Sequence, residues 1–207
     1  FSLKDYGVYG EVAVVPAYGV VKRPKGLTAV EAAAVWMAYI TAYGALIDIA
    51  KIGKGDAVII TAASSSVGLA AIQIANSVGA TSIATTRTNA KVSALKAAGA
   101  SHVVATEEQD LVETINTITN GKGARIVFDP IGGQGVDKLA QATSPGGTLI
   151  LYGGLSLEPT LFPVASAFMK GLSLRGYVMF EIVGDKARRE AAIAFITKGL
   201  EAGTLKP

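Results

Sequence analysis

The 207-residue sequence contains no cysteine and a single histidine, His102. Without cysteine, the chain can form neither a disulfide nor a thiolate-bound metal site, and one imidazole cannot make a histidine cluster. We therefore predict no metal site among these residues and a structural role for His102. The absence of cysteine also fits a reducing compartment, and we expect a cytoplasmic protein.

Charge is also scarce, since only 17 % of the residues are charged and the formal net charge is +3. Lysines and arginines are scattered and do not alternate with aromatic residues, which argues against nucleic-acid binding. Uninterrupted apolar runs reach roughly eight residues, fewer than the about 20 that a membrane helix needs. No leader pattern opens the sequence. We expect a small-molecule substrate and no nucleic-acid or membrane partner.

Hydrophobic residues make up 50 % of the chain, enough for one α/β domain with a full core. Residues 1–27 differ from the rest, because glycine and proline interrupt them and the only alternating run is Glu11–Val15. They predict one or two strands and a connector. Thr28 and Glu31 form a capping-box pattern, which predicts a long buried helix with a break near Gly44.

From residue 57 onward, short apolar segments alternate with helical patterns. Strands are predicted at 57–61, 81–86, 102–105, 124–129, 147–152 and 172–178. Helices are predicted at 66–78, 88–98, 109–119, 134–142, 163–170 and 185–201. Strands that are apolar on both faces are typical of a parallel sheet covered on both sides. The pattern predicts an α/β, doubly wound, parallel six-stranded Rossmann sheet with strand order 3-2-1-4-5-6.

The turn after the first strand has the position of a phosphate-binding loop. Its frame is Ala62-x-x-Ser65-x-x-Gly68, with only the last glycine of the usual glycine-rich turn. Backbone N–H groups and the positive end of a helix dipole favour an anion there, and serine hydroxyls can donate to phosphate or cap the helix. Taken alone, the motif also fits a serine-capped helix without a ligand.

The residue type at the end of the second strand distinguishes NAD-binding from NADP-binding domains. An acidic residue there binds the ribose 2′-hydroxyl of NAD, whereas arginine accommodates the 2′-phosphate of NADP. This sequence has Arg87, followed by Lys91, and no acidic residue between Thr81 and Ser101. We therefore predict NADP (NADPH) as the cofactor, against the alternative that both cations are solvated surface residues.

Several ordered segments resemble the medium-chain dehydrogenase/reductase superfamily, in particular its zinc-independent quinone oxidoreductase (zeta-crystallin-like) branch. The matching segments are Ala33–Leu46, Gly53–Ala75, Lys91–Val104, Val127–Gly133, Pro145–Gly154 and Leu174–Tyr177. The segment Gly7–Val12 resembles the last strands of the family's GroES-like catalytic domain. The resemblance implies that residues 1–27 are a remnant of that domain, that 28–207 are the NADP-binding Rossmann domain, and that the chain is a fragment.

The resemblance also implies the cofactor contacts. Pyrophosphate would lie against Ser65, Ser66 and Val67, and the 2′-phosphate against Arg87 and Lys91. The adenine ribose would lie between Pro130 and Ile131. The nicotinamide would be lined by Gly153, Gly154, Met179 and Phe180, with Thr41 nearby. Zinc-dependent members have a cysteine ligand where this chain has Met37, which argues against a catalytic zinc. A homodimer through the sixth strand is likewise implied.

The sequence leaves the roles of two tyrosines and one aspartate open. Tyr39 and Tyr43 lie on the predicted buried helix, where a core role is favoured over proton donation. Asp129 ends the fourth predicted strand, and it either contacts the cofactor or caps the following turn. No catalytic residue is assigned.

The predicted function is NADPH-dependent hydride transfer to a quinone or an α,β-unsaturated carbonyl. The alternatives are an enoyl-thioester reductase of fatty-acid or polyketide type and a non-catalytic nucleotide-binding protein.

Overall fold

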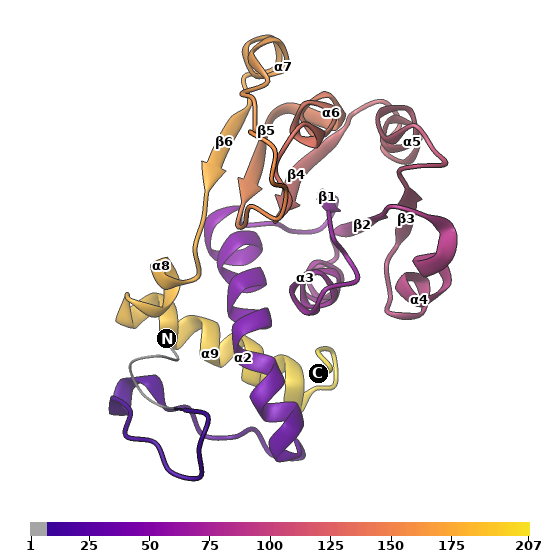
Figure 1. Ribbon diagram of the computed structural model, residues 1–207. Coiled ribbons are helices and arrows are strands. Elements are labelled where there is room, and N and C mark those ends of the chain that lie inside the picture. Colours follow the sequence, from indigo (N-terminus) through magenta and orange to yellow (C-terminus); the bar gives the residue numbers. More distant parts are fainter. Residues whose placement is uncertain (1–7) are drawn as a thin grey trace.

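Six parallel strands form one sheet in the computed structural model, which describes residues 8–207 (Figure 1). The strands are β1 Ala57–Ile60, β2 Thr81–Thr86, β3 His102–Ala105, β4 Ala124–Asp129, β5 Thr143–Leu151 and β6 Ser173–Gly176. Their order is β3-β2-β1-β4-β5-β6, and every neighbouring pair is parallel. The predicted doubly wound topology is confirmed.

Helices cover both faces of this sheet. They are α2 Ala29–Tyr43, α3 Ser66–Ser77, α4 Val92–Ala97, α5 Leu111–Ile118, α6 Gly135–Ala142, α7 Val164–Lys170, α8 Phe180–Val183 and α9 Lys186–Glu201, with short η1 Ala17–Gly19, η2 Gly44–Ile49 and η3 Asn89–Lys91. Figure 1 shows α2, α3 and α9 on one side of the sheet and α5 and α6 on the other.

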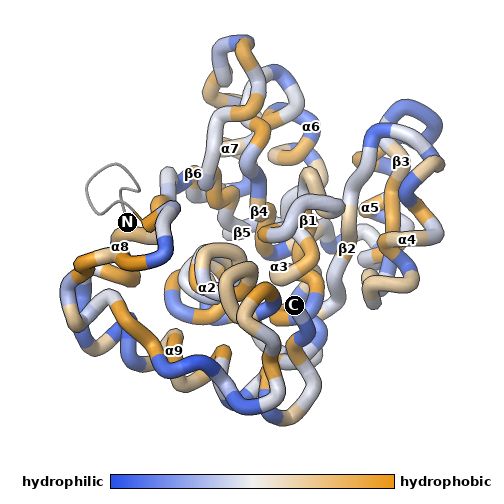
Figure 2. The backbone as a smooth tube through the Cα atoms, turned by 60° about the horizontal axis from the view of Figure 1, so that its bottom comes forward, coloured by the Kyte–Doolittle hydropathy of each residue, from blue (hydrophilic) through white to orange (hydrophobic). Residues whose placement is uncertain are grey.

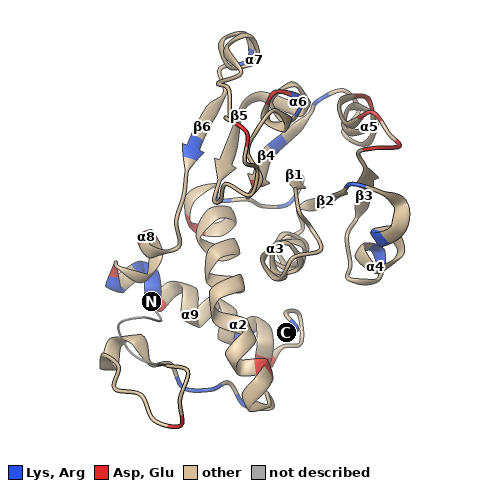
Figure 3. Cartoon of the chain, viewed as in Figure 1, with Lys and Arg blue, Asp and Glu red and all other residues tan. Residues whose placement is uncertain are grey.

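Successive strand residues point to opposite faces of the sheet and so build two cores. Ile60 and Phe128 pack with α2, α3 and α9, whereas Ile59 and Val127 pack with α5 and α6. All four side chains are fully buried. Figure 2 shows the apolar residues running through the strands, and Figure 3 shows the charged residues scattered around them. Burial on both faces explains why these strands are apolar throughout.

The predicted strand at Glu11–Val15 is wrong. Residues 8–28 contain bends, extended chain and the short helix η1, but no strand. A strand needs a neighbour to satisfy its backbone hydrogen bonds, and this segment has none among residues 8–207. The Gly7–Val12 motif begins at Gly7, which lies outside the described residues.

The predicted break at Gly44 is also wrong, because α2 continues without interruption into the π-helix η2. Gly44 has ordinary helical dihedral angles. A Cβ atom there would lie within 2.5 Å of both the Tyr177 hydroxyl and an Ile182 side-chain carbon. Gly44 therefore permits the close approach of the α8 region to the helix, and it does not end the helix.

By length and composition, the continuous helix Ala29–Ile49 could cross a membrane. It contacts α3 and α9, and 56 % of its most apolar window is buried. We interpret it as a core helix whose apolar surface is covered by its neighbours.

Strand β6 lies at the outer edge of the sheet, paired with β5 on one side only within the described chain. The pairing of two copies through this strand stays a prediction.

Candidate nucleotide-binding site

The turn between β1 and α3 has the geometry of a phosphate cradle. Ser65 is the N-cap of α3, and its hydroxyl accepts a hydrogen bond from the Gly68 backbone N–H at 3.1 Å. A Cβ atom on Gly68 would lie 2.6 Å from the Ala63 backbone, so only glycine lets the helix approach the turn this closely. Ser65 and Ser66 are exposed and Val67 is half-buried. The exposed helix N-terminus fits a pyrophosphate, as the sequence predicts.

Arg87 and Lys91 meet in one pocket of about 310 Å³ at the end of β2. The Lys91 ammonium donates a hydrogen bond to the Ser64 hydroxyl at 3.0 Å, which draws it toward the phosphate turn. Within residues 8–207, the Arg87 guanidinium has no ion-pair partner. The lining residues include four threonines, Ser64 and these two cations, but no acid. Such a pocket is suited to an anion.

A second cavity, of about 430 Å³, continues along the carboxyl ends of the strands. Ile131 and Thr106 line both cavities, and the contact of Ile131 with the adenine ribose stays a prediction. Pro130 is buried, and its carbonyl oxygen would lie 2.8 Å from a Cβ atom on Gly153. Pro130 thus supports the turn after β5, and it does not line either cavity.

Asp129 is a capping residue in this structure. Its buried carboxylate accepts hydrogen bonds from the Thr61 hydroxyl, the Ile131 N–H at 3.2 Å and the Gly132 N–H at 2.8 Å. These bonds fix the turn after β4 and join it to the end of β1. Asp129 also lines the cavity of about 430 Å³, and its contact with a cofactor stays a prediction.

The predicted nicotinamide end lies beyond β5 and β6. A hollow of about 350 Å³ is lined there by Gly153, together with Leu151, Tyr152, Gly176, Tyr177, Val178 and Glu181. The Thr41 hydroxyl donates to the Met37 carbonyl at 2.6 Å and lies 3.7 Å from the Met179 sulfur. The structure therefore brings Thr41 and Met179 together, whereas Gly154 and Phe180 are exposed outside the hollow.

Two polar residues of this site were missed from the sequence. Ser64 belongs to the serine run, and only its hydrogen bond to Lys91 distinguishes it from its neighbours. Tyr152 precedes Gly153, and its ring stacks on Phe128 with centroids 3.9 Å apart. Its buried hydroxyl has no hydrogen-bond partner among the described residues. Burial raises the pKa of Tyr152 far above its ordinary value, and the Asp129 charge adds to the shift.

Neither of the two tyrosines on α2 faces the cofactor cavities. The Tyr39 hydroxyl donates to the Lys206 carbonyl at 2.5 Å and to the Gln73 side chain at 3.0 Å, fixing the C-terminal segment against α2 and α3. The Tyr43 ring packs against Phe195 of α9. Both contacts support the core role that the sequence favours.

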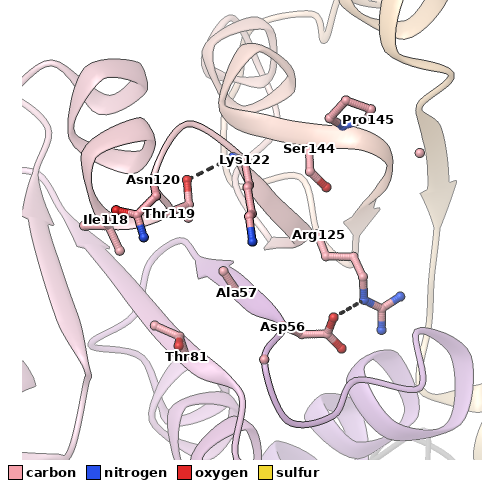
Figure 4. A pocket seen from close by; sticks show the side chains of 13 residues that line it. Asp56, Ala57, Thr81, Ile118, Thr119, Asn120, Lys122, Arg125, Ser144 and Pro145 are labelled. Carbon is pink, nitrogen blue, oxygen red and sulfur yellow. Dashed lines mark hydrogen bonds and ion pairs between the residues drawn. The ribbon is translucent and has the colours of Figure 1, made fainter.

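A further cavity, of about 460 Å³, opens at the amino ends of the strands (Figure 4). It contains an ion pair between Arg125 and Asp56, whose Nε and Oδ1 atoms are 2.7 Å apart. Arg125 also donates to the Ala50 carbonyl, so it ties β4 to the segment before β1. Ligands of open parallel sheets bind beyond the carboxyl ends of the strands. The nucleotide site is therefore assigned to the two cavities beside the phosphate turn.

The donor set does not fit a zinc ion. Residues 8–207 contain no group of three histidine, cysteine or acidic side chains that could hold a metal. Met37, at the position of the expected ligand, is 63 % exposed. No chemistry is assigned to zinc in this chain.

The sheet order and the phosphate cradle define a dinucleotide-binding domain. Comparison with protein families matches residues 66–198 to the family described as zinc-binding dehydrogenase. The chain therefore belongs to this family, within the medium-chain dehydrogenase/reductase superfamily predicted from the sequence.

Three known proteins illustrate the similarity. The mitochondrial enoyl-[acyl-carrier-protein] reductase of Rattus norvegicus is 32 % identical over 175 residues, covering 83 % of this chain and 47 % of the relative. The structure of an NAD-dependent alcohol dehydrogenase has 33 % identity and a TM-score of 0.83, covering 93 % of this chain and 54 % of that one. A mycobacterial protein solved with NADPH has 25 % identity and a TM-score of 0.87, covering 96 % and 62 %. The chain thus spans about half the length of the curated relatives that it matches.

Proposed function

We propose that this chain is the nucleotide-binding part of an NADPH-dependent oxidoreductase that reduces a quinone or another α,β-unsaturated carbonyl. The observation that carries the cofactor preference is the pocket at the end of β2, where Arg87 and Lys91 converge without an acid. A ribose 2′-phosphate would place its charge between them, whereas the unmodified ribose of NADH would leave both cations unmatched. The similar structures include both an NAD-dependent enzyme and an NADPH complex, so the proposed preference rests on this pocket.

In this proposal the nucleotide supplies the hydride, and the chain binds and orients it. The α3 N-terminus and Ser65 hold the pyrophosphate, Arg87 and Lys91 hold the 2′-phosphate, and the hollow beside Gly153 receives the nicotinamide. A carbonyl conjugated to a carbon–carbon double bond accepts hydride at the carbon remote from the oxygen. The similarity to an enoyl-thioester reductase favours such a thioester as one member of this substrate class.

Binding titrations test the cofactor preference. NADPH and NADH are titrated into the protein and followed by their fluorescence. Arg87→Ala is expected to weaken NADPH by about tenfold or more, because a hydrogen bond to a charged group is worth roughly 1.5–3 kcal/mol. NADH binding should change by less than about twofold on the same scale. Lys122→Ala is the matched control, because Lys122 is an exposed cation that lines the cavity at the amino ends of the strands, away from the nucleotide site. Equal losses for both nucleotides would refute the role of Arg87.

The electron acceptor is tested with the intact protein. NADPH oxidation is followed with a short benzoquinone and, separately, with a trans-2-enoyl thioester. Faster turnover of the thioester would favour the enoyl-thioester alternative, and faster turnover of the quinone would favour a quinone reductase. Saturable NADPH binding without oxidation by either acceptor would support a non-catalytic nucleotide-binding protein. Absence of saturable binding would overturn the proposal as a whole.

A further inference from the structure

Ser64 lies between the phosphate turn and the pocket at the end of β2. Its hydroxyl accepts a hydrogen bond from the Lys91 ammonium at 3.0 Å. It also lines the same cavity of about 310 Å³ as Arg87 and Lys91. The residue is exposed, so its hydroxyl is accessible to a ligand in that cavity. Ser64 therefore brings a polar group of the phosphate turn into the proposed 2′-phosphate pocket.

The backbone fixes Ser64 in this place. Ala63, directly before it, is fully buried, and its N–H donates to the Thr85 carbonyl of β2 at 3.4 Å. The Ser65 N–H donates to the Ala62 carbonyl at 2.9 Å, which closes a tight turn around Ser64. Ala62 has a positive φ of 45°, a strained conformation for a residue with a Cβ atom. Such strain persists only where the surrounding structure enforces it, and it is concentrated at functional sites.

The bond to Lys91 also determines how the Ser64 hydroxyl can act. An ammonium group can only donate, so the Ser64 oxygen accepts with one lone pair and keeps its hydrogen free to donate. Within residues 8–207, this is the only hydrogen bond of the Ser64 side chain. The positive charge of Lys91 repels the hydroxyl hydrogen and directs it away from the ammonium. The hydroxyl is therefore a donor available to a ligand oxygen in the cavity.

A ribose 2′-phosphate matches the groups that meet here. It has three terminal oxygens, all strong acceptors, and close to two negative charges at neutral pH. Arg87 and Lys91 supply two positive charges, and no acid lines the pocket. Lys91 gives one of its three N–H donors to Ser64 and keeps two for a ligand. With the Ser64 hydroxyl, three donor groups from two segments are available to three phosphate oxygens.

We propose that Ser64 is a specificity-determining residue for the nucleotide: it donates a hydrogen bond to the 2′-phosphate while it accepts one from Lys91. This inference rests on the proposed NADPH-dependent function. NADH has a hydroxyl in place of this phosphate, so the charge-assisted bond from Ser64 forms only with NADPH. Ser64 therefore acts on the choice between the two nucleotides, and not on the pyrophosphate that both contain.

Ser64→Ala is the test, titrated with NADPH, with NADH and with 2′,5′-ADP, which carries the 2′-phosphate but no nicotinamide. The variant should bind NADPH and 2′,5′-ADP about tenfold more weakly, because a hydrogen bond to a charged group is lost. NADH binding should change by less than about twofold on the same scale. Ser64→Thr keeps the hydroxyl and should retain most of the preference for NADPH. Because residue 64 is exposed, both variants should melt at the wild-type temperature.

A second background separates direct donation from an effect through Lys91. A serine that only held the ammonium in place would have no effect once that ammonium is gone. Direct donation instead predicts that adding Ser64→Ala to Lys91→Met weakens NADPH binding by a further threefold or more, on the order of one hydrogen bond. No further loss in the Lys91→Met protein would overturn the inference.

Ser77→Ala is the matched control, because Ser77 is an exposed serine at the other end of α3. It should leave the affinity for all three ligands unchanged. A Ser64→Ala variant that keeps the wild-type preference for NADPH over NADH would overturn the inference and leave the proposed function intact. Wild-type protein that binds neither NADPH nor 2′,5′-ADP would instead refute the proposed function.

Discussion

Replacement of Gly68 by alanine tests the close packing of α3 on the phosphate turn. The added Cβ would lie 2.6 Å from both the Cα and the carbonyl oxygen of Ala63 and 2.7 Å from its carbonyl carbon. All three atoms belong to the backbone, so no side chain can rotate away to relieve the overlap. The helix must shift from the turn or the turn must deform.

The magnitude follows from two opposing contributions. Overpacking of a well-packed interior costs roughly 1–3 kcal/mol, and backbone atoms place this site in the upper part of that range. Alanine has a higher helix propensity than glycine by about 1 kcal/mol, which offsets part of the cost. The free energy of unfolding should therefore fall by about 1–2 kcal/mol. For a domain of this size the melting temperature should fall by about 2–8 °C.

Thermal unfolding followed by circular dichroism measures this shift, with Gly135→Ala as the matched control. Gly135 is the first residue of α6, and a Cβ there would meet no atom within 4 Å. Its replacement should leave the melting temperature unchanged or raise it, because alanine restricts the unfolded chain. A Gly68→Ala variant that melts as high as Gly135→Ala would show that the turn yields freely, and it would refute the packing argument.

Two further predictions concern capping interactions. Asp129→Ala should lower the free energy of unfolding by about 3 kcal/mol in urea titrations, because the Thr61 hydroxyl and two backbone N–H groups lose their buried acceptor; a loss near zero would contradict the capping role. Thr28→Ala should cost about 1 kcal/mol through loss of the capping box at α2. The partner carboxylate, Glu31, has a lowered pKa because it accepts from Thr28. Its contribution should be present at neutral pH and disappear as the pH falls through that lowered pKa, and a pH-independent Thr28→Ala effect would refute this reading.

The sheet could be predicted because its signals are local. The central strands β1 and β4 are largely buried on both faces, and apolar strands alternate with helical patterns along the chain, so the order of the elements could be predicted from the sequence. The convergence of Arg87 and Lys91 could also be predicted from the sequence. Both residues follow β2 directly, so local geometry is enough to bring them into one pocket.

Features that depend on contacts between residues far apart in the sequence could not be predicted from local patterns. Gly44 resembled a helix break, but its role is set by Tyr177 and Ile182, more than a hundred residues away. Tyr152 resembled an ordinary strand residue, and only the structure shows that its ring stacks on Phe128 and that its buried hydroxyl has no hydrogen-bond partner among the described residues. Likewise, an alternating segment such as Glu11–Val15 becomes a strand only where another strand is present to pair with it.

In the phosphate turn, Ala62 and Ser65 stand where the usual motif has glycine, and the two replacements differ in backbone strain. Ala62 has a positive φ of 45°, a conformation that costs a residue with a Cβ atom roughly 1–2 kcal/mol. Ser65 has φ −76° and ψ 161°, which any residue adopts without strain. The strain of the altered frame therefore falls on Ala62, at the start of the turn, and not on the serine at the helix N-terminus. Serine at residue 65 costs nothing in backbone conformation, so the contribution that we propose for it in pyrophosphate binding rests on its hydroxyl.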